Sequence, residues 1–323
     1  MSVEARTVVR EREADLVVSG SAPVADDVVA LTLVDPDGRD LPAWTPGAHI
    51  DLVLGDDLTR QYSLCGSTAD TKSYRVAILK NPTGRGGSIA AHTLTAGTSV
   101  RIRGPRNHFS LSGSGRYQFI AGGIGITPIL PMISDAQATG ADWNLLYGGR
   151  TRSSMAFLDE LAEHDGRVTV VPEDECGRLD LAAVLDTPRA DTAVYCCGPT
   201  GLLDAVEKLC EPWDPGALHF ERFSAKELST TASSDSAFEV ILARSGMTLS
   251  VPPDKSVFDV CQEAGVSVLG SCYQGVCGTC ETGVLDGEVD HRDSILNEEE
   301  RESNELMMIC VSRCRSEKLT LDL

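Results

Sequence analysis

Short runs of apolar residues, separated by turns rich in Pro, Gly and Asp, occupy the first third of the chain. Runs of this length that are rich in Val, Ile and Leu predict β-strands. Regularly spaced short strands favour a small antiparallel barrel. We therefore predict an antiparallel β-barrel domain over residues 1–112, with strands at 28–34, 48–54, 74–79 and 99–103.

From residue 113 onward the strand-like runs alternate with helical stretches. This alternation predicts a parallel sheet with helices on both faces. We expect this α/β domain to span residues 113–223, with strands at 117–121, 143–147, 168–171 and 193–197.

The last third of the chain begins with a segment rich in Ser, Thr and Ala, residues 224–237, which predicts a flexible linker. Residues 238–323 then have the size of one small α+β domain. In that domain we expect a hairpin from strands at 238–242 and 247–251, and a helix over 256–263 that Ser256 caps. The chain as a whole is therefore expected to be multidomain.

Four cysteines of the last domain have a spacing typical of iron–sulfur proteins. Cys272, Cys277 and Cys280 read C-x4-C-x2-C, and Cys310 follows after a long gap. This is the plant-type spacing for a [2Fe–2S] cluster held by four thiolates. Glycines within the loop allow it to curl tightly and let backbone amides point at the sulfurs. Cys310 is expected on a buried strand within the apolar run 307–311.

A zinc site or a disulfide framework fits these cysteines less well. Zinc sites usually combine two short C-x2-C hooks, and this loop has one. A disulfide framework belongs to secreted proteins, and we find no signal peptide in residues 1–30.

Two motifs in the barrel region together predict a flavin site. Arg60, Tyr62 and Ser63 precede a Gly-Arg-Gly-Gly-Ser stretch at 84–88, in which Ser88 is a candidate helix N-cap. Small residues and a cation at a helix N-terminus form a suitable phosphate cradle. We expect Tyr62 to stack on the isoalloxazine, Ser63 to bond the ring, and Arg60 with Ser88 to hold the phosphate. The alternative is ordinary turn glycines and a surface arginine. Further candidate flavin contacts are Ala77, Leu79, Arg85, Gly86 and Gly87.

Glycine-containing turns at two strand ends predict a nicotinamide-nucleotide site. One turn lies between a strand and a helix, where a pyrophosphate binds, and the second ends a further strand of the same sheet. Ligands of α/β sheets bind at the carboxyl ends of strands, so both turns are well placed. The candidate residues are Gly122, Gly123, Gly125 and Thr127 in the first turn, and Cys197, Gly198 and Pro199 in the second.

The three regions in this order, with these motifs, resemble the phthalate dioxygenase reductase family, the reductases of Rieske oxygenases. The match covers nearly the whole chain and includes the segment His-Phe-Glu-Arg-Phe at 219–223. It implies an FMN domain related to ferredoxin-NADP reductase, a pyridine-nucleotide domain and a plant-type β-grasp ferredoxin domain. It also implies that Phe223 shields the flavin, and that Glu221 and Cys197 flank the hydride path beside Ser63.

The implied activity is NADH oxidation, with electrons passing through FMN and a [2Fe–2S] cluster to a terminal Rieske-type oxygenase that acts on aromatic rings or demethylates. Alternatives are a reductase partner of a cytochrome P450, a free-standing flavin or quinone reductase, or a redox sensor without turnover. The resemblance favours NADH. Arg150 and Arg152 follow the second strand of the α/β sheet, where a 2′-phosphate would bind, and they favour NADPH.

The amino-acid composition limits the classes of partner that this chain is expected to bind. The net charge of −20 and the pI of about 4.6 argue against nucleic acid, because phosphates would repel this surface. The charge suits a basic protein partner or simply solubility. No apolar run has the length of a membrane helix, so we expect no membrane partner and a cytoplasmic location.

Overall fold

The computed structural model describes residues 12–55, 58–164, 166–224, 236–296 and 298–323. Most of the predicted linker, residues 225–235, lies outside them. The described residues form two compact units, one of residues up to 179 with 191–194 and one of the remainder. Each unit is described by itself.

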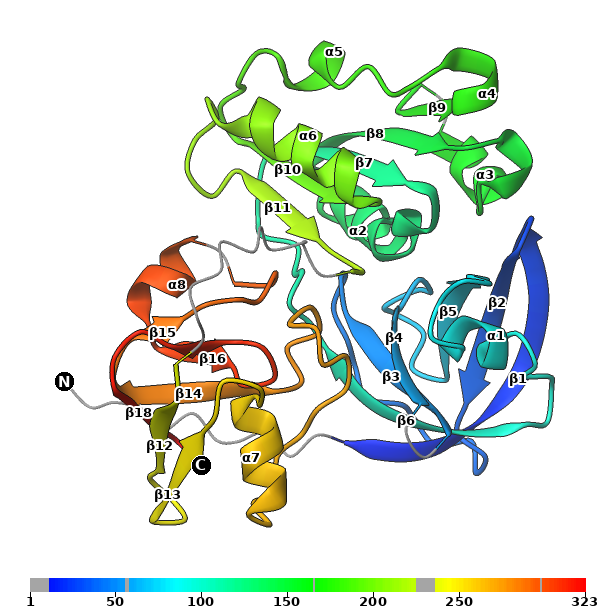
Figure 1. The fold of residues 1–323 in the computed structure, drawn as a ribbon. Coiled ribbons are helices and arrows are strands. Elements are labelled where there is room, and N and C mark those ends of the chain that lie inside the picture. The colour runs from blue at the N-terminus through cyan, green and yellow to red at the C-terminus, as the bar shows by residue number, and fades with distance from the viewer. Residues whose placement is uncertain (1–11, 56–57, 165, 225–235, 297) are drawn as a thin grey trace. The chain divides into compact units, whose positions relative to one another are not determined.

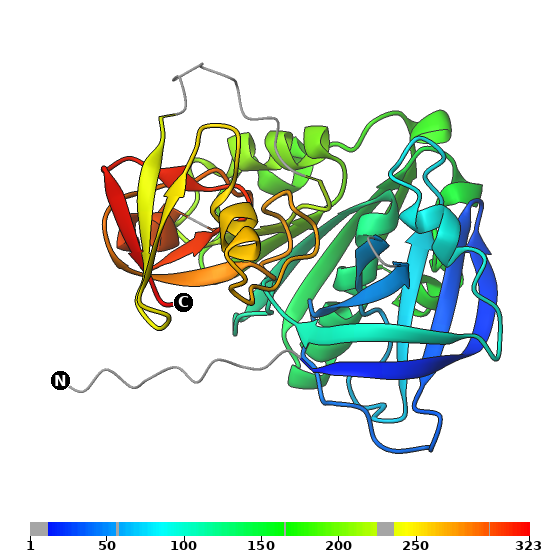
Figure 2. The same cartoon turned by 60° about the horizontal axis from the view of Figure 1, so that its bottom comes forward.

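Six antiparallel strands form a barrel, in the order β4-β3-β6-β1-β2-β5 (Figure 1; Figure 2). A bridge between Leu64, just after β4, and Val76 of β5 joins the two ends of this order and closes the barrel. The strands are β1 (Glu13–Ala25), β2 (Val28–Val34), β3 (His49–Gly55), β4 (Leu58–Ser63), β5 (Ser73–Leu79) and β6 (Ser99–Arg106), and one short helix, α1 (Gly87–Ala91), precedes β6.

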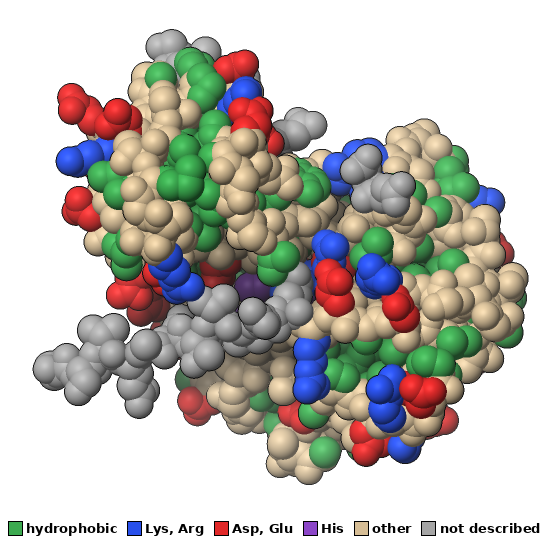
Figure 3. Space-filling view, turned by 90° about the horizontal axis from the view of Figure 1, so that it is seen from below, with side chains coloured by type: hydrophobic (Ala, Val, Ile, Leu, Met, Phe, Trp, Pro, Cys, Tyr) green, Lys and Arg blue, Asp and Glu red, His purple; other side chains and the backbone are tan. Residues whose placement is uncertain are grey.

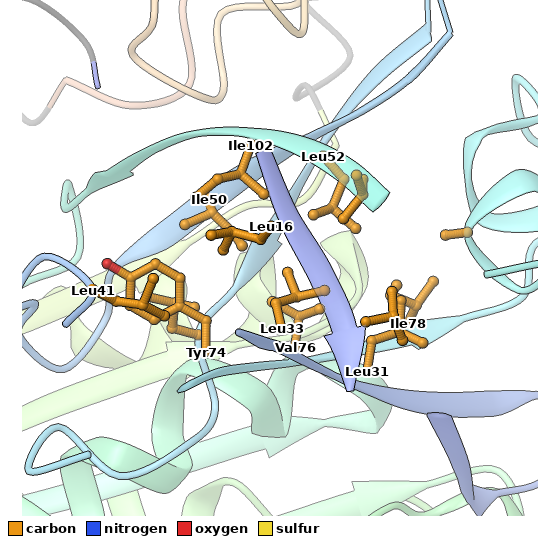
Figure 4. Packing of buried hydrophobic residues seen from close by; sticks show 14 of the residues in the cluster. Leu16, Leu31, Leu33, Leu41, Ile50, Leu52, Tyr74, Val76, Ile78 and Ile102 are labelled. Carbon is orange, nitrogen blue, oxygen red and sulfur yellow. The ribbon is translucent and has the colours of Figure 1, made fainter. Parts of the chain in front are cut away.

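The barrel interior is filled by side chains that alternate along each strand (Figure 4). Leu31 and Leu33 of β2 and Ile50 and Leu52 of β3 are completely buried, whereas Thr32 and Val34 of β2 are only partly buried. Because such alternation puts every second side chain in the core, it holds the strand register and with it the direction of the polar side chains on β4.

A second sheet has the strand order β11-β10-β7-β8-β9, and β7, β8 and β9 pair in parallel, as predicted. Its strands are β7 (Arg116–Gly122), β8 (Asp142–Gly149), β9 (Val168–Pro172), β10 (Thr192–Cys197) and β11 (Leu218–Glu221). The connecting helices are η1 (Gly123–Gly125), α2 (Ile126–Thr139), η2 (Arg152–Ser154), α3 (Leu158–Leu161), η3 (Ala162–His164), α4 (Glu173–Cys176), α5 (Ala182–Leu185) and α6 (Thr200–Cys210).

The C-terminal residues form a third sheet, β13-β12-β18-β14-β16, in which β12 and β18 are parallel and the β12–β13, β14–β16 and β14–β18 pairs are antiparallel. This mixed sheet with one packed helix is the expected β-grasp arrangement. Its elements are β12 (Phe238–Leu242), β13 (Met247–Val251), α7 (Val257–Glu263), β14 (Glu281–Asp286), β15 (Val289–Asp290), α8 (Glu298–Ser303), β16 (Leu306–Met308), β17 (Arg313–Cys314) and β18 (Lys318–Leu321).

The predicted cap of α7 is confirmed and is reciprocal. Ser256 Oγ accepts from the Asp259 amide at 3.1 Å, and the Ser256 amide donates to Asp259 Oδ2 at 2.9 Å. Such a capping box satisfies two amides that the helix leaves unpaired, so it sets where α7 begins.

Surface charges are largely arranged in pairs on the barrel. Arg101 of β6 contacts Asp15 of β1 at 3.0 Å, and Arg103 contacts Glu13 at 2.7 Å. Lys and Arg side chains lie beside Asp and Glu side chains on the face that Figure 3 displays. Among the helices of the described residues, none combines the length and apolarity that a membrane span requires.

Candidate functional site

The flavin-site prediction rests first on Arg60, which the barrel holds in place. Arg60 lies within β4. Its Nη1 donates to the Thr59 carbonyl at 2.7 Å, and its Nη2 donates to the Arg85 carbonyl at 2.9 Å. The second bond fastens β4 to the glycine-containing loop, so the structure does bring the two predicted motifs together.

Two cations, the guanidinium groups of Arg60 and Arg85, therefore lie together in the predicted phosphate cradle. Burial, and next the charge of Arg85, lower the pKa of Arg60. Neither guanidinium makes an ion pair with a carboxylate in the described part of the barrel. Neighbouring cations without an acidic partner suit a doubly charged phosphate, which would neutralise both.

Gly87 is the position where the loop cannot carry a side chain. A Cβ on Gly87 would lie 2.3 Å from Cγ and 2.8 Å from Nε of Arg60. The preceding Gly86 has a φ of 78°, in the left-handed region that glycine adopts most easily. The expectation that Ser88 caps the helix is wrong. Gly86 is at the N-cap, and Ser88 Oγ instead accepts from the Asn81 amide at 2.9 Å.

The remaining predicted flavin contacts lie on adjacent barrel strands. Tyr62 of β4 pairs with Ile50, is half-buried, and has its pKa raised to about 12, chiefly by burial. It therefore stays a neutral aromatic surface at physiological pH. Ser63 is buried at the end of β4. On β5, Ala77 is buried and Leu79 is exposed. Their contacts with a flavin stay predictions.

The cysteine loop curls as the spacing requires. Cys272, Cys277 and Cys280 are buried in it, and Gly275 has a φ of 66°. A Cβ on Gly275 would lie 2.6 Å from a Val311 methyl, so the loop passes too close to its neighbour for any larger residue. Backbone amides also face sulfur, since the Gln274 amide donates to Cys272 Sγ at 3.3 Å.

Cys310 reaches the loop from a turn, which corrects the expectation of a buried strand over 307–311. Strand β16 ends at Met308, and Cys310 lies in the following turn and is only partly buried. Its thiol interacts with those of Cys272 and Cys280 and with the Gly275 amide. A strand would point alternate side chains to opposite faces, whereas the turn directs Cys310 to the loop.

The four thiols fit a two-iron cluster. Cys277 interacts with Cys272 and also lies 3.2 Å from Thr279 Oγ1. No three His, Cys, Asp or Glu side chains lie close enough to ligate a single metal ion, as far as the described chain extends. A [2Fe–2S] cluster divides four thiolates between two irons, so four converging thiols suit it.

The predicted pyrophosphate turn connects β7 to α2. Gly122 ends β7, Gly123 and Gly125 bound the η1 turn, and Thr127 lies in the first turn of α2, where its hydroxyl donates to the Ile124 carbonyl at 3.0 Å. No side chain caps this end of α2, and no acidic residue lies in its first turn. A helix start without acidic residues, at the carboxyl end of β7, is where an α/β sheet binds a pyrophosphate.

Cys197 ends β10 and contacts Glu221 of β11. The Cys197 thiol is fully buried and donates to Glu221 Oε2 at 3.9 Å. Gly198 and Pro199 follow, and Pro199 is at the N-cap of α6. Phe223 lies two residues beyond Glu221 and is 46% exposed. Its ring is therefore accessible to a flat ligand.

The environment of Cys197 predicts a thiol whose protonation state does not change near neutral pH. Burial, and then Glu221 and Cys196, raise the pKa of the Cys197 thiol well above its usual value. The thiol should therefore remain protonated through about pH 8.5, where free cysteine ionises. We expect stopped-flow rates of flavin reduction by NADH to show no limb near that pH. A limb present in the wild type and absent in Cys197→Ala would contradict this expectation.

Arg222 is a residue that the motifs did not identify as functional. It is buried, its Nη2 donates to Glu207 Oε2 at 2.8 Å and its Nη1 to Asp204 Oδ1 at 3.4 Å. Both acids belong to α6, so Arg222 fixes the segment between Glu221 and Phe223 against that helix. The only signal in the sequence is one arginine between those two residues, which does not reveal its partners.

Two family models match parts of the chain. Residues 240–315 match a 2Fe-2S iron-sulfur cluster binding domain, and residues 119–208 match an oxidoreductase NAD-binding domain. The first range contains the cysteine loop and Cys310, and the second contains the β7–α2 turn and Cys197.

Similar proteins cover almost the whole chain. The phenoxybenzoate dioxygenase subunit beta of Ectopseudomonas oleovorans is 43% identical over 302 residues, which are 93% of this chain and 94% of that protein. The structure of phthalate dioxygenase reductase, described as a modular structure for electron transfer from pyridine nucleotides to [2Fe-2S], matches with a TM-score of 0.70 and 34% identity over 96% of this chain and 98% of that one.

A cytochrome P450 structure also contains a similar segment. An intact type IV self-sufficient cytochrome P450 monooxygenase matches with a TM-score of 0.91 and 44% identity over 96% of this chain. The match covers 41% of that P450 chain, so this chain spans about two fifths of its length.

Proposed function

Since this chain belongs to the phthalate dioxygenase reductase family, we propose that it is the reductase component of an oxygenase system. It takes electrons from NADH and delivers them, by way of FMN and a [2Fe–2S] cluster, to a terminal Rieske-type oxygenase. The observation that carries the proposal is that one chain combines a two-arginine cradle with four thiols at plant-type spacing.

The chain's residues hold and orient the groups. Arg60, Arg85 and the Gly86–Gly87 turn receive the flavin phosphate, and Tyr62 offers its ring to the isoalloxazine. When bound, the flavin takes two electrons from NADH and releases them singly, and the cluster carries one at a time. As the family resemblance implies, Cys197 and Glu221 would position the nicotinamide, and Phe223 would shield the flavin until nicotinamide enters.

The energetics of the last transfer favour a Rieske acceptor. Plant-type clusters have potentials near about −400 mV, whereas Rieske clusters lie at about −150 to +300 mV. An electron therefore moves downhill from this chain to such an oxygenase.

We also propose the domain limits 1–112, 113–223, 224–237 and 238–323. We further propose a cytoplasmic location, because reduced thiols persist in that compartment.

The second candidate acceptor is a cytochrome P450, which the 44% identity to part of a self-sufficient P450 favours. Relatives that match over 94% and 97% of their length include a dioxygenase subunit and a carnitine monooxygenase reductase subunit. Because their lengths agree with that of this chain, we place the Rieske-type acceptor first.

The acceptor is tested by anaerobic stopped-flow mixing of the reduced protein with a purified Rieske oxygenase or a purified bacterial P450. We expect the Rieske centre to be reduced faster, by at least about tenfold at equal concentration, since transfer to it is downhill. Faster reduction of the P450 haem would make the second candidate the correct one. Reduction of neither, with rapid reduction of free flavin or quinone, would indicate a free-standing reductase.

A further inference from the structure

The segment after β8 carries two arginines in the place where α/β sheets usually contact the adenosine ribose of a dinucleotide. Strand β8 lies beside β7, which leads into the pyrophosphate turn, and it ends at Gly149. Arg150 and Arg152 follow. A carboxylate in this region accepts from the 2′-hydroxyl of NAD, whereas an arginine accommodates the 2′-phosphate of NADP. The sequence by itself therefore favours NADPH here.

The structure shows that the guanidinium of Arg152 is already paired with a carboxylate. Its Nε donates to Glu175 Oε1 at 3.2 Å, and its Nη2 donates to Oε2 of the same carboxylate at 3.0 Å. This is a bidentate pair, the same geometry with which a guanidinium binds phosphate. The bond to Glu175 is also the main reason that the pKa of Arg152 is raised. A 2′-phosphate would have to displace Glu175 to reach the same nitrogen atoms.

Glu175 reaches this place because the fold positions α4 there. Strand β9 pairs with β8 in a register that sets Pro172 opposite Gly149, and α4 begins at the next residue, Glu173. The Asp174 amide then donates to the Arg150 carbonyl at 3.2 Å. Helix α4 is thereby fastened to the segment that contains Arg152.

The same helix makes this corner acidic. Glu173, Asp174 and Glu175 are consecutive, and Glu173 contacts Arg178 at 3.6 Å. A nucleotide with a 2′-phosphate brings about two further negative charges toward Glu175, whose carboxylate repels it, whereas a 2′-hydroxyl brings no charge.

We propose that Glu175 is the specificity-determining residue that selects NADH over NADPH. It occupies the guanidinium of Arg152 and sets a carboxylate against the 2′-phosphate. The pair is exposed, with 54% of the arginine side chain and 47% of the glutamate side chain accessible, so the Arg152–Glu175 bond alone is weak. The discrimination comes from the bond and the repulsion together. The inference rests on the proposed function, because it requires that the chain oxidises NADH.

The variant Glu175→Gln tests this inference with the complete, flavin- and cluster-loaded protein. We expect kcat/KM for NADPH to rise at least about tenfold while that for NADH changes less than about threefold, since selectivity is a difference of binding free energies. The matched control is Glu173→Gln, which removes the same charge from the same helix but leaves Arg152 paired. It should change the ratio of the two constants by less than about threefold.

A double substitution separates the roles of the two residues. In Arg152→Gln/Glu175→Gln the gain for NADPH should be largely lost, because the freed guanidinium is gone. Arg152→Gln alone should leave kcat/KM for NADH within about threefold of the wild type, since that guanidinium is engaged with Glu175.

Binding without turnover gives an independent readout. In calorimetric titrations, Glu175→Gln should bind 2′,5′-ADP at least about tenfold more tightly than the wild type, with 5′-AMP binding unchanged. Equal effects of Glu175→Gln and Glu173→Gln, or no gain in 2′,5′-ADP binding, would overturn the inference. A wild-type protein that oxidises neither nucleotide would instead refute the proposed function, so the two failures are distinguishable.

Discussion

Replacing Cys277 with alanine should remove the iron–sulfur absorption and lower electron delivery to a one-electron protein acceptor by at least about 100-fold. Cys277 is buried in the loop and interacts with Cys272, so its loss leaves one iron with an incomplete set of ligands. NADH-dependent reduction of a two-electron dye should stay within about twofold of the wild type, because the flavin and nucleotide residues are untouched. Visible absorption, iron analysis and the two assays measure these outcomes.

The matched control is Cys314→Ala in the same domain. Cys314 lies on β17, four residues beyond Cys310, and its thiol donates to the Ser316 carbonyl at 2.9 Å. We expect this variant to keep the cluster spectrum and the transfer rate. If Cys277→Ala retained transfer to the protein acceptor, the cluster would not be on the electron path.

Replacing Gly87 with alanine should give a protein that binds flavin about 10- to 100-fold more weakly, because the loss of a charged hydrogen bond has that magnitude. The new Cβ would overlap the middle of the Arg60 side chain, which must then leave its bonds to the Thr59 and Arg85 carbonyls. Flavin affinity, measured by fluorescence titration of the flavin-free protein with FMN, reports the effect. Circular dichroism shows whether the barrel is intact.

Gly84→Ala is the control for this loop. A Cβ on Gly84 would approach Asn81 at 3.2 Å and does not reach Arg60. We expect a change in flavin affinity of less than about threefold. Wild-type affinity in Gly87→Ala, or an equal loss in Gly84→Ala, would show that Arg60 does not hold the phosphate.

Apolar strands were the part of the fold that could be predicted from the sequence. The strands at 28–34, 238–242 and 247–251 match β2, β12 and β13 residue for residue, and the other predicted strands, apart from that at 307–311, agree to within a few residues. Seven strands of the described chain were missed, namely β1, β4, β11, β14, β15, β17 and β18. In β1, Gly20 and Pro23 interrupt the alternation, and the register with β2 shifts at both places. In β4, polar residues dominate because the strand carries the flavin candidates.

The site was predictable where spacing along the chain determines geometry, and less so elsewhere. The three ligands in the cysteine loop are only a few residues apart, so their convergence follows from local structure. The pair of Arg152 and Glu175 joins residues 23 positions apart, and it depends on the β8–β9 register. Ser88 looked like an N-cap because local preference favours serine there, but the left-handed Gly86 takes that position.

The most direct test of the electron path is anaerobic addition of NADH to the purified protein, with the cluster followed by electron paramagnetic resonance. Protein that contains about two irons and one FMN should develop the signal of a reduced [2Fe–2S] cluster, whereas the same protein stripped of flavin should not. A cluster that NADH reduces equally well without flavin, or a preparation that binds neither iron nor flavin after reconstitution, would contradict the account.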